Sequence, residues 1–355
     1  MSLAEIPKKR IKELLNYLRE EYRLVAPIKE HEKLVFKEVK SVGDIVITDE
    51  LPYKSPKEFL FPQLERMMSF DAAGELKIED QVEKTIVFGV RPCDLEALKI
   101  LKAVLAQGRF HDAWFVRRME NAIFIGMNCI SEKPGCFCAE RGINKRYTDA
   151  CDVFFTDTGD YYTVQIITDA GRSLFNTFSF DDFQFSQCFC MEGMTEECCK
   201  LDDESELEAE SKLKLKSESY DRENLLEINA EENIVFNQID WDRIAERCMG
   251  CGICTYLCPT CHCFAFKDVK EKDLSVRYRV WDSCMYPKFT LHASGHNPRA
   301  TKKERFRQRV MHKYMYIKKN QGYTACTGCG RCVRSCPVGM NIKSVVSEIM
   351  GELDG

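Results

Sequence analysis

Two cysteine runs with identical spacing constrain this chain more than any other feature of its sequence. The first extends from Cys248 to Pro259 and the second from Cys326 to Pro337, and each reads C-x2-C-x2-C-x3-C-P. In this pattern three closely spaced thiolates wrap a short loop around one iron-sulfur cube, while the fourth cysteine, followed by proline, reaches the other cube. The repeat therefore predicts two [4Fe-4S] clusters that exchange one ligand each.

The exchange rule assigns eight cysteines to the two predicted clusters. Small residues support the assignment, since Gly250 and Gly328 let the backbone approach inorganic sulfides, where amide hydrogens stabilise a reduced cluster. Structural zinc is the alternative, but zinc modules usually pair two C-x2-C knuckles and lack the third cysteine and the Cys-Pro ending. The predicted ligand sets are Cys248, Cys251, Cys254 and Cys336 for one cluster, and Cys326, Cys329, Cys332 and Cys258 for the other.

Composition indicates metal-bound rather than disulfide-bonded thiols. The chain has 20 cysteines in 355 residues, which is long enough for a hydrophobic core, and residues 6–18 read as a charged amphipathic helix rather than a signal peptide. Apolar runs such as residues 86–90 are too short to span a bilayer, and a net charge of −5 argues against nucleic acid as a partner. We expect a cytoplasmic protein from an anaerobic setting that associates with neither membranes nor nucleic acids.

Changes in composition predict an α+β chain with three regions. Residues 1–187 alternate short β-rich runs with helical patterns, which favours an α/β domain, and residues 188–233 are charged and poor in aromatics, which is typical of an exposed connector. Residues 234–355 are expected to form a mainly helical, ferredoxin-like dicluster domain. The expected strands are 33–39, 44–48, 85–90, 122–127, 153–156 and 161–167, and a helix is expected over 94–105.

Four cysteines of the first region lie where loops should begin. Cys93 and Cys129 each follow an expected strand, and Cys136 and Cys138 come shortly afterwards. Adjacent strand ends would bring the four together, and the neighbouring Arg91 favours ionised thiolates. They are therefore candidate ligands of a third [4Fe-4S] cluster. The alternative is that they are small buried hydrophobic residues, because cysteine is among the most buried residue types.

Three cysteines around the first run raise a second question. Cys261, Cys263 and Cys284 lie close to it, and His292 and His296 follow a little further on. Three thiolates and one imidazole, such as that of His296, would suit a metal ion. The simpler interpretation is packing beside the clusters, since both runs already have complete ligand sets.

The last group of thiols falls in or beside the connector. Cys188, Cys190, Cys198 and Cys199 form either a further site or incidental exposed thiols, and we favour the second interpretation. The adjacent pair is not the paired-cysteine motif of heterodisulfide reductases, because Lys200 stands where that motif needs glycine.

Several motifs taken together resemble a known family. They are VRPCDL at 90–95, GCFC at 135–138, CPTCHC at 258–263, WDSC at 281–284 and GHNPR at 295–299. In these motifs the chain resembles the iron-sulfur beta subunits of cytosolic sulfhydrogenases, and it is similar also to the iron-sulfur subunits of anaerobic sulfite reductases, over about residues 24–350. The resemblance implies an electron-transfer protein that connects a flavin-containing, NAD(P)H- or ferredoxin-linked subunit with a catalytic one such as a nickel-iron hydrogenase. It also favours the third cluster.

No motif for catalysis accompanies the cluster motifs. The sequence has neither nickel-binding cysteine pairs nor a glycine-rich dinucleotide-binding turn after a strand, so we expect the reaction to occur in partner subunits. A stand-alone redox enzyme with a reactive thiol or an open cluster site is the alternative class, and it predicts turnover by the isolated chain. A nucleic-acid binder, which only the basic stretch 299–319 supports, would be retained on DNA at physiological salt.

Overall fold

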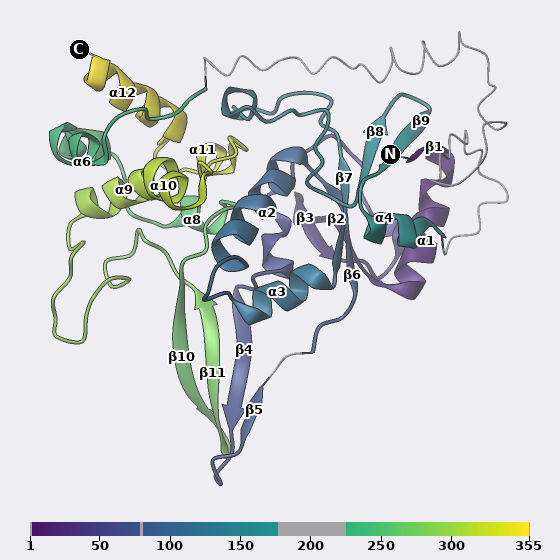
Figure 1. The fold of residues 1–355 in the computed structure, drawn as a ribbon, viewed down its shortest axis with the longest axis horizontal. Helices are drawn as coiled ribbons and strands as arrows, with labels where there is room; N and C mark the ends of the chain where they lie inside the picture. Colours follow the sequence, from purple (N-terminus) through teal and green to yellow (C-terminus); the bar gives the residue numbers. More distant parts are fainter. Residues whose placement is uncertain (1, 79–80, 177–224, 355) are drawn as a thin grey trace.

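The computed structural model describes residues 2–78, 81–176 and 225–354 (Figure 1). These residues form a seven-stranded mixed sheet covered by helices, a four-stranded antiparallel sheet that projects from the body, and a group of short helices towards the C-terminus. Cys188, Cys190, Cys198 and Cys199 lie outside the described residues, as does most of the expected connector.

Parallel strands occupy the centre of the seven-stranded sheet. Its order is β1 (Ser2–Pro7), β9 (Tyr161–Ile166), β8 (Val153–Asp157), β7 (Ala122–Met127), β6 (Thr85–Val90), β2 (Arg23–Glu30) and β3 (Lys33–Glu38). Strands β2, β6, β7 and β8 run parallel, and the outer strands are antiparallel to their neighbours. All residues of β6 are buried, which is expected for a strand covered on both faces.

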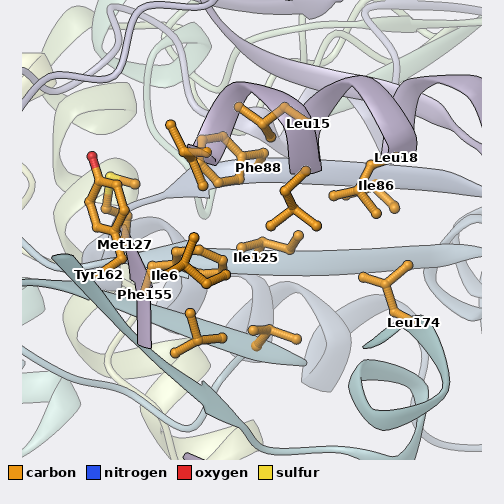
Figure 2. Close-up of a cluster of buried hydrophobic side chains, with 14 of the residues drawn as sticks. Ile6, Leu15, Leu18, Ile86, Phe88, Ile125, Met127, Phe155, Tyr162 and Leu174 are labelled. Carbon is orange, nitrogen blue, oxygen red and sulfur yellow. The ribbon is translucent and has the colours of Figure 1, made fainter. Parts of the chain in front are cut away.

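Two pairs of helices cover the two faces of this sheet. The helices are α1 (Ile11–Glu21), α2 (Pro92–Leu105), α3 (Ala113–Glu120) and α4 (Asp169–Asn176). Leu15 of α1 and Leu174 of α4 join Phe88 in one core, which Figure 2 shows. Phe115 of α3 joins Val87 in the core on the other face, together with residues of α2. Neighbouring residues of β6 face opposite sides of the sheet, so Phe88 and Val87 belong to different cores. Helix α2 begins shortly after β6, and its first turn lies near the loop that follows β7.

The four-stranded sheet combines segments far apart in the sequence. Its order is β10 (Phe264–Glu271), β11 (Leu274–Trp281), β4 (Leu64–Phe70) and β5 (Leu76–Ile78). The hairpin β10–β11 therefore pairs with a strand of the first 100 residues, and its base lies beside the cysteine runs (Figure 1). Residues 234–355, expected to be mainly helical, thus contribute two long strands as well. Their alternating polar and apolar residues favour such strands.

Short helices surround the cysteine runs. They are α6 (Glu232–Gln238), α7 (Trp241–Ala245), α8 (Ile253–Tyr256), α9 (Lys302–Met311), α10 (Ile317–Gln321), α11 (Arg331–Arg334) and α12 (Ile342–Asp354). A π-helical turn, His312–Tyr316, joins α9 to α10, and a capping box of Thr301 and Glu304 starts α9. Val310 and Val346 lie at the centre of the core between these helices. No helix within the described ranges has the length and apolar character needed to cross a bilayer.

Two expected elements differ from the structure, and the remaining expected strands are present within one residue at each end. Residues 44–48 form no strand: a 3₁₀ turn, Val42–Asp44, is followed by a single bridge from Ile45 to Ile28, and Ile45 is buried against the sheet. The helix expected over 6–18 begins only at Ile11, because Ile6 and Pro7 belong to the edge strand β1. The other 3₁₀ turns are Lys8–Arg10, Pro56–Phe59 and Ala139–Arg141.

Candidate iron-sulfur centres

The first predicted set of thiols surrounds one cavity. Its walls are apolar and include Phe306 and Ile342, and Arg309 also lines it. Backbone amides point at two of the sulfurs: that of Gly250 donates to Cys248 at 3.4 Å and that of Met340 donates to Cys336 at 3.2 Å. Such bonds stabilise a thiolate. The four predicted ligands that line the cavity are Cys248, Cys251, Cys254 and Cys336.

The second set surrounds a neighbouring cavity. Arg309 and Cys332 line both spaces, so the two cavities are directly adjacent. The proline-linked Cys258 of the first run lies with the second run, and Cys336 of the second run lies with the first. This grouping is compatible with the exchange that the spacing predicts; the ligation itself stays a prediction. The predicted ligands lining the second cavity are Cys326, Cys329, Cys332 and Cys258.

Buried donors at these cavities fit an occupant rich in acceptors. Arg309 is 4% exposed, and its Nε donates to Cys254 Sγ at 3.1 Å, but its Nη1 has no hydrogen-bond partner. The hydroxyl of Thr327, which lines the second cavity, is also buried without a partner. Since buried polar groups are nearly always hydrogen-bonded, these donors suit the sulfides of an iron-sulfur cluster.

Buried lysines add positive charge to the same region. Lys313 donates to Cys258 Sγ at 3.0 Å, and Lys57 donates to the carbonyls of Cys258 and Cys261, each at 2.8 Å. Burial opposes the charged form of Lys313, but attraction to the thiols of Cys258 and Cys261 outweighs this effect and raises the pKa of Lys313. Burial lowers the pKa of Lys57. Among the described residues neither lysine forms an ion pair with a carboxylate, and a thiolate at Cys258 would supply the counterion of Lys313.

The N-terminal candidate ligands lie against the second run. Cys93 lies in the first turn of α2 and is buried near Cys129 and Cys329. Cys129 follows β7 and lies near Cys136, whose Sγ donates to the carbonyl of Cys329 at 3.3 Å. Burial raises the pKa of Cys129 to about 11 and that of Cys138 to about 12, so a metal must displace their protons. The structure thus brings the four thiols together; a cluster there stays a prediction.

His296 is the predicted site residue that the structure leaves apart from its expected partners. It lies in an exposed loop, where its ring is 5.5 Å from that of His292 and its carbonyl accepts the His292 amide at 2.8 Å. Cys261, Cys263 and Cys284 instead line a cavity next to the second one. No three Cys, His, Asp or Glu side chains in the described part of the chain are arranged to hold a single metal ion.

Comparison with known proteins gives the same dicluster pattern. The family model of the 4Fe-4S dicluster domain matches residues 247–340. The chain is 30% identical over 338 residues to the beta subunit of sulfhydrogenase 2 from Pyrococcus furiosus, and the match covers 95% of both chains. The chain belongs to the sulfhydrogenase beta-subunit family. It is therefore an iron-sulfur electron-transfer protein. No solved structure matches it.

In this member of the sulfhydrogenase beta-subunit family, a buried ion pair joins helix α2 to the second cysteine run. The sequence motifs did not predict this pair. Arg331 donates to both carboxylate oxygens of Asp94, at 2.6 and 2.7 Å, and each side chain is 1% exposed. Arg331 begins α11 within the second run, and Asp94 follows Cys93 on α2. The pair therefore positions the N-terminal thiols against the second cavity. Its only sequence signals are a charged residue beside a cysteine in each motif.

Proposed function

We propose that this chain is the electron-transfer subunit of a multisubunit oxidoreductase. It relays electrons between a flavin-containing subunit, linked to NAD(P)H or ferredoxin, and a catalytic subunit of the nickel-iron hydrogenase type. One observation carries the proposal: two cysteine quartets line adjacent cavities that share Cys332 and Arg309. The quartets would hold two [4Fe-4S] clusters, which supply one-electron redox centres when bound. The name of the Pyrococcus furiosus relative supports a hydrogenase as the enzyme served.

The chain's own residues insulate and tune these centres. Apolar side chains such as Phe306 and Ile342 line much of the first cavity, and the amides of Gly250 and Met340 bond to its thiols. The buried cations Arg309 and Lys313 favour the more negative, reduced state of a neighbouring cluster and therefore raise its reduction potential.

We also propose a third [4Fe-4S] cluster bound by the N-terminal thiols. Support comes from their common position against the second run and from the Asp94–Arg331 pair that holds it. Replacing Cys136 and Cys138 together by Ser should lower the iron content of anaerobically purified protein by about four per chain, because serine is a poor ligand for these clusters. Unchanged iron in the double variant would make the four thiols structural. The predicted ligands are Cys93, Cys129, Cys136 and Cys138.

The relay is tested with the protein purified anaerobically from its own host, as a complex and as the isolated chain. Hydrogen and NAD(P)H should each bleach the visible absorbance of this chain within the complex, and the isolated chain should neither oxidise hydrogen nor turn over NAD(P)H. Turnover by the isolated chain would favour a stand-alone enzyme, and a sirohaem partner would favour a sulfite reductase. Both outcomes contradict the proposal.

We propose a cytoplasmic location for this complex. The 16 cysteines in the described ranges are all free thiols, as is usual in reducing compartments. Cell fractionation should recover the protein with the cytoplasmic enzymes and not with the membranes.

A further inference from the structure

A third cavity lies beside the two that hold the predicted quartets. It shares Arg309 and Lys313 with the cavity of the second run. Cys261, Cys263 and Cys284, which belong to neither quartet, line it. Like the second cavity, the third thus presents several thiols and the same two cations.

The base of the hairpin β10–β11 fixes these thiols. Cys263 immediately precedes β10, and its carbonyl accepts the amide of Asp282 at 2.9 Å across the base of the hairpin. Cys284 follows Ser283, which is fully buried and whose hydroxyl lies 2.8 Å from that of Thr255 in the first run. The side chains of Cys263 and Cys284 are in hydrogen-bonding contact. The two ends of one hairpin therefore bring Cys263 and Cys284 together.

The surroundings of the third cavity favour an anion. Arg309 and Lys313 line it. Both side chains are 4% exposed, and within the described ranges neither is paired with a carboxylate. The Nη1 atom of Arg309 also lacks a hydrogen-bond partner. Thiolates and inorganic sulfides would balance the charge and accept this remaining donor.

We propose that Cys261, Cys263 and Cys284 bind a further [4Fe-4S] cluster in the third cavity, with an imidazole of the His262–His312 pair as ligand to its fourth iron. Both histidines line the cavity, and their rings lie 5.6 Å apart. His262 Nδ1 is 3.0 Å from the carbonyl of Thr260. A proton on this nitrogen leaves Nε2 free for a metal, which is the usual arrangement of a metal-bound histidine.

Zinc held by the same three thiolates and one imidazole is the competing chemistry. One observation favours the cluster: no three ligand side chains in the described part of the chain are arranged for a single ion, whereas the thiolates of a cube bind different irons. The proposal concerns ligation alone and holds whichever enzyme the chain serves.

Iron counting in a variant that lacks the N-terminal ligands tests this site independently of the third cluster proposed above. The full-length Cys136→Ser/Cys138→Ser protein, purified anaerobically, should retain about twelve iron and twelve acid-labile sulfide per chain, from the two quartets and the third cavity. About eight iron would overturn the proposal, and so would about eight iron with one equivalent of zinc.

Replacing Cys261 and Cys263 by Ser in the same background should remove about four more iron and one cluster signal from the electron paramagnetic resonance spectrum. Cys151→Ser is the matched control, because Cys151 is a buried thiol of the N-terminal core, 5% exposed, and it lines none of the three cavities. It should lose no iron. If the multiple variant does not fold, the iron count of the Cys136→Ser/Cys138→Ser protein still decides.

The imidazole ligand has its own spectroscopic test. Replacing the ligating histidine, His262 or His312, by Ala should leave a fourth iron without a protein ligand. Brief ferricyanide oxidation should then produce a three-iron signal that is absent from Cys261→Ser/Cys263→Ser protein. Failure of both histidine variants to produce this signal would overturn the assignment of an imidazole ligand.

Discussion

The cavities of the two cysteine runs differ in their access to solvent although the runs share one spacing. Cys251 of the first run is exposed, and its neighbour Met249 is 62% exposed. In the second cavity Cys258 and Cys329 are only 8% and 7% exposed, and Cys136 donates to the carbonyl of Cys329. The same local motif therefore gives one centre near the surface, which a partner can approach, and a second centre that is buried in the interior.

The contacts that bury the second run should make the larger contribution to stability. Asp94→Ala should lower the free energy of unfolding by about 3–5 kcal/mol, because it leaves the Arg331 guanidinium buried without its counterion. The matched control is Glu348→Ala, which breaks an ion pair with Arg243 near the first run at the surface, where the two side chains are 39% and 50% exposed. It should cost at most about 1 kcal/mol. Chemical denaturation under anaerobic conditions measures both, and equal losses would contradict the contrast.

Equivalent glycines of the two runs should respond differently to a methyl group. Gly328 and Gly250 have φ of +62° and +69°, so either substitution by Ala costs about 1 kcal/mol of backbone strain. A Cβ at Gly328 would also lie 2.5 Å from the carbonyl oxygen of Phe137, whereas at Gly250 the nearest atom is 3.6 Å away. Gly328→Ala should therefore cost about 3 kcal/mol in total and Gly250→Ala only the strain. Thermal unfolding of both variants checks this difference, and equal losses would show that the N-terminal loop does not pack on the second run.

Air should attack the two centres in sequence. Because Cys251 is exposed, oxidants reach the first cavity before the second, so the first cluster should be lost several-fold faster. Spectra of reduced samples taken at intervals of brief air exposure follow both signals. Simultaneous loss would show that solvent access does not distinguish the centres.

The spacing of the cysteines predicts much of the site because the ligand pattern of a dicluster loop is local in sequence. The partners that bury the second run are not local. Asp94 and Arg331 are separated by 237 residues, and Lys57 and Cys258 by 201. Their meeting depends on α2 and on the hairpin β10–β11 pairing with β4, and sequence patterns give no register for such pairings.

Nearness in sequence also misled the choice of histidine. His296 follows Cys284 closely but lies in an exposed surface loop, while His312 is farther along the chain and lines the third cavity from the π-helical turn after α9. The expected strand at 44–48 failed for a related reason, since its apolar residues cover the core and form only a single bridge to β2. In both cases tertiary packing decides what the local pattern leaves open.

Exchange of the proline-linked ligands is the central claim, and spectra of four single variants test it most directly. The reference variants are Cys251→Ala for the first cavity and Cys329→Ala for the second, since each of these thiols lines one cavity only. Cys336→Ala should then reproduce the electron paramagnetic resonance spectrum of Cys251→Ala, and Cys258→Ala that of Cys329→Ala. If Cys336→Ala instead matched Cys329→Ala, each run would bind its own cluster with its own four thiols, and the exchange would be wrong.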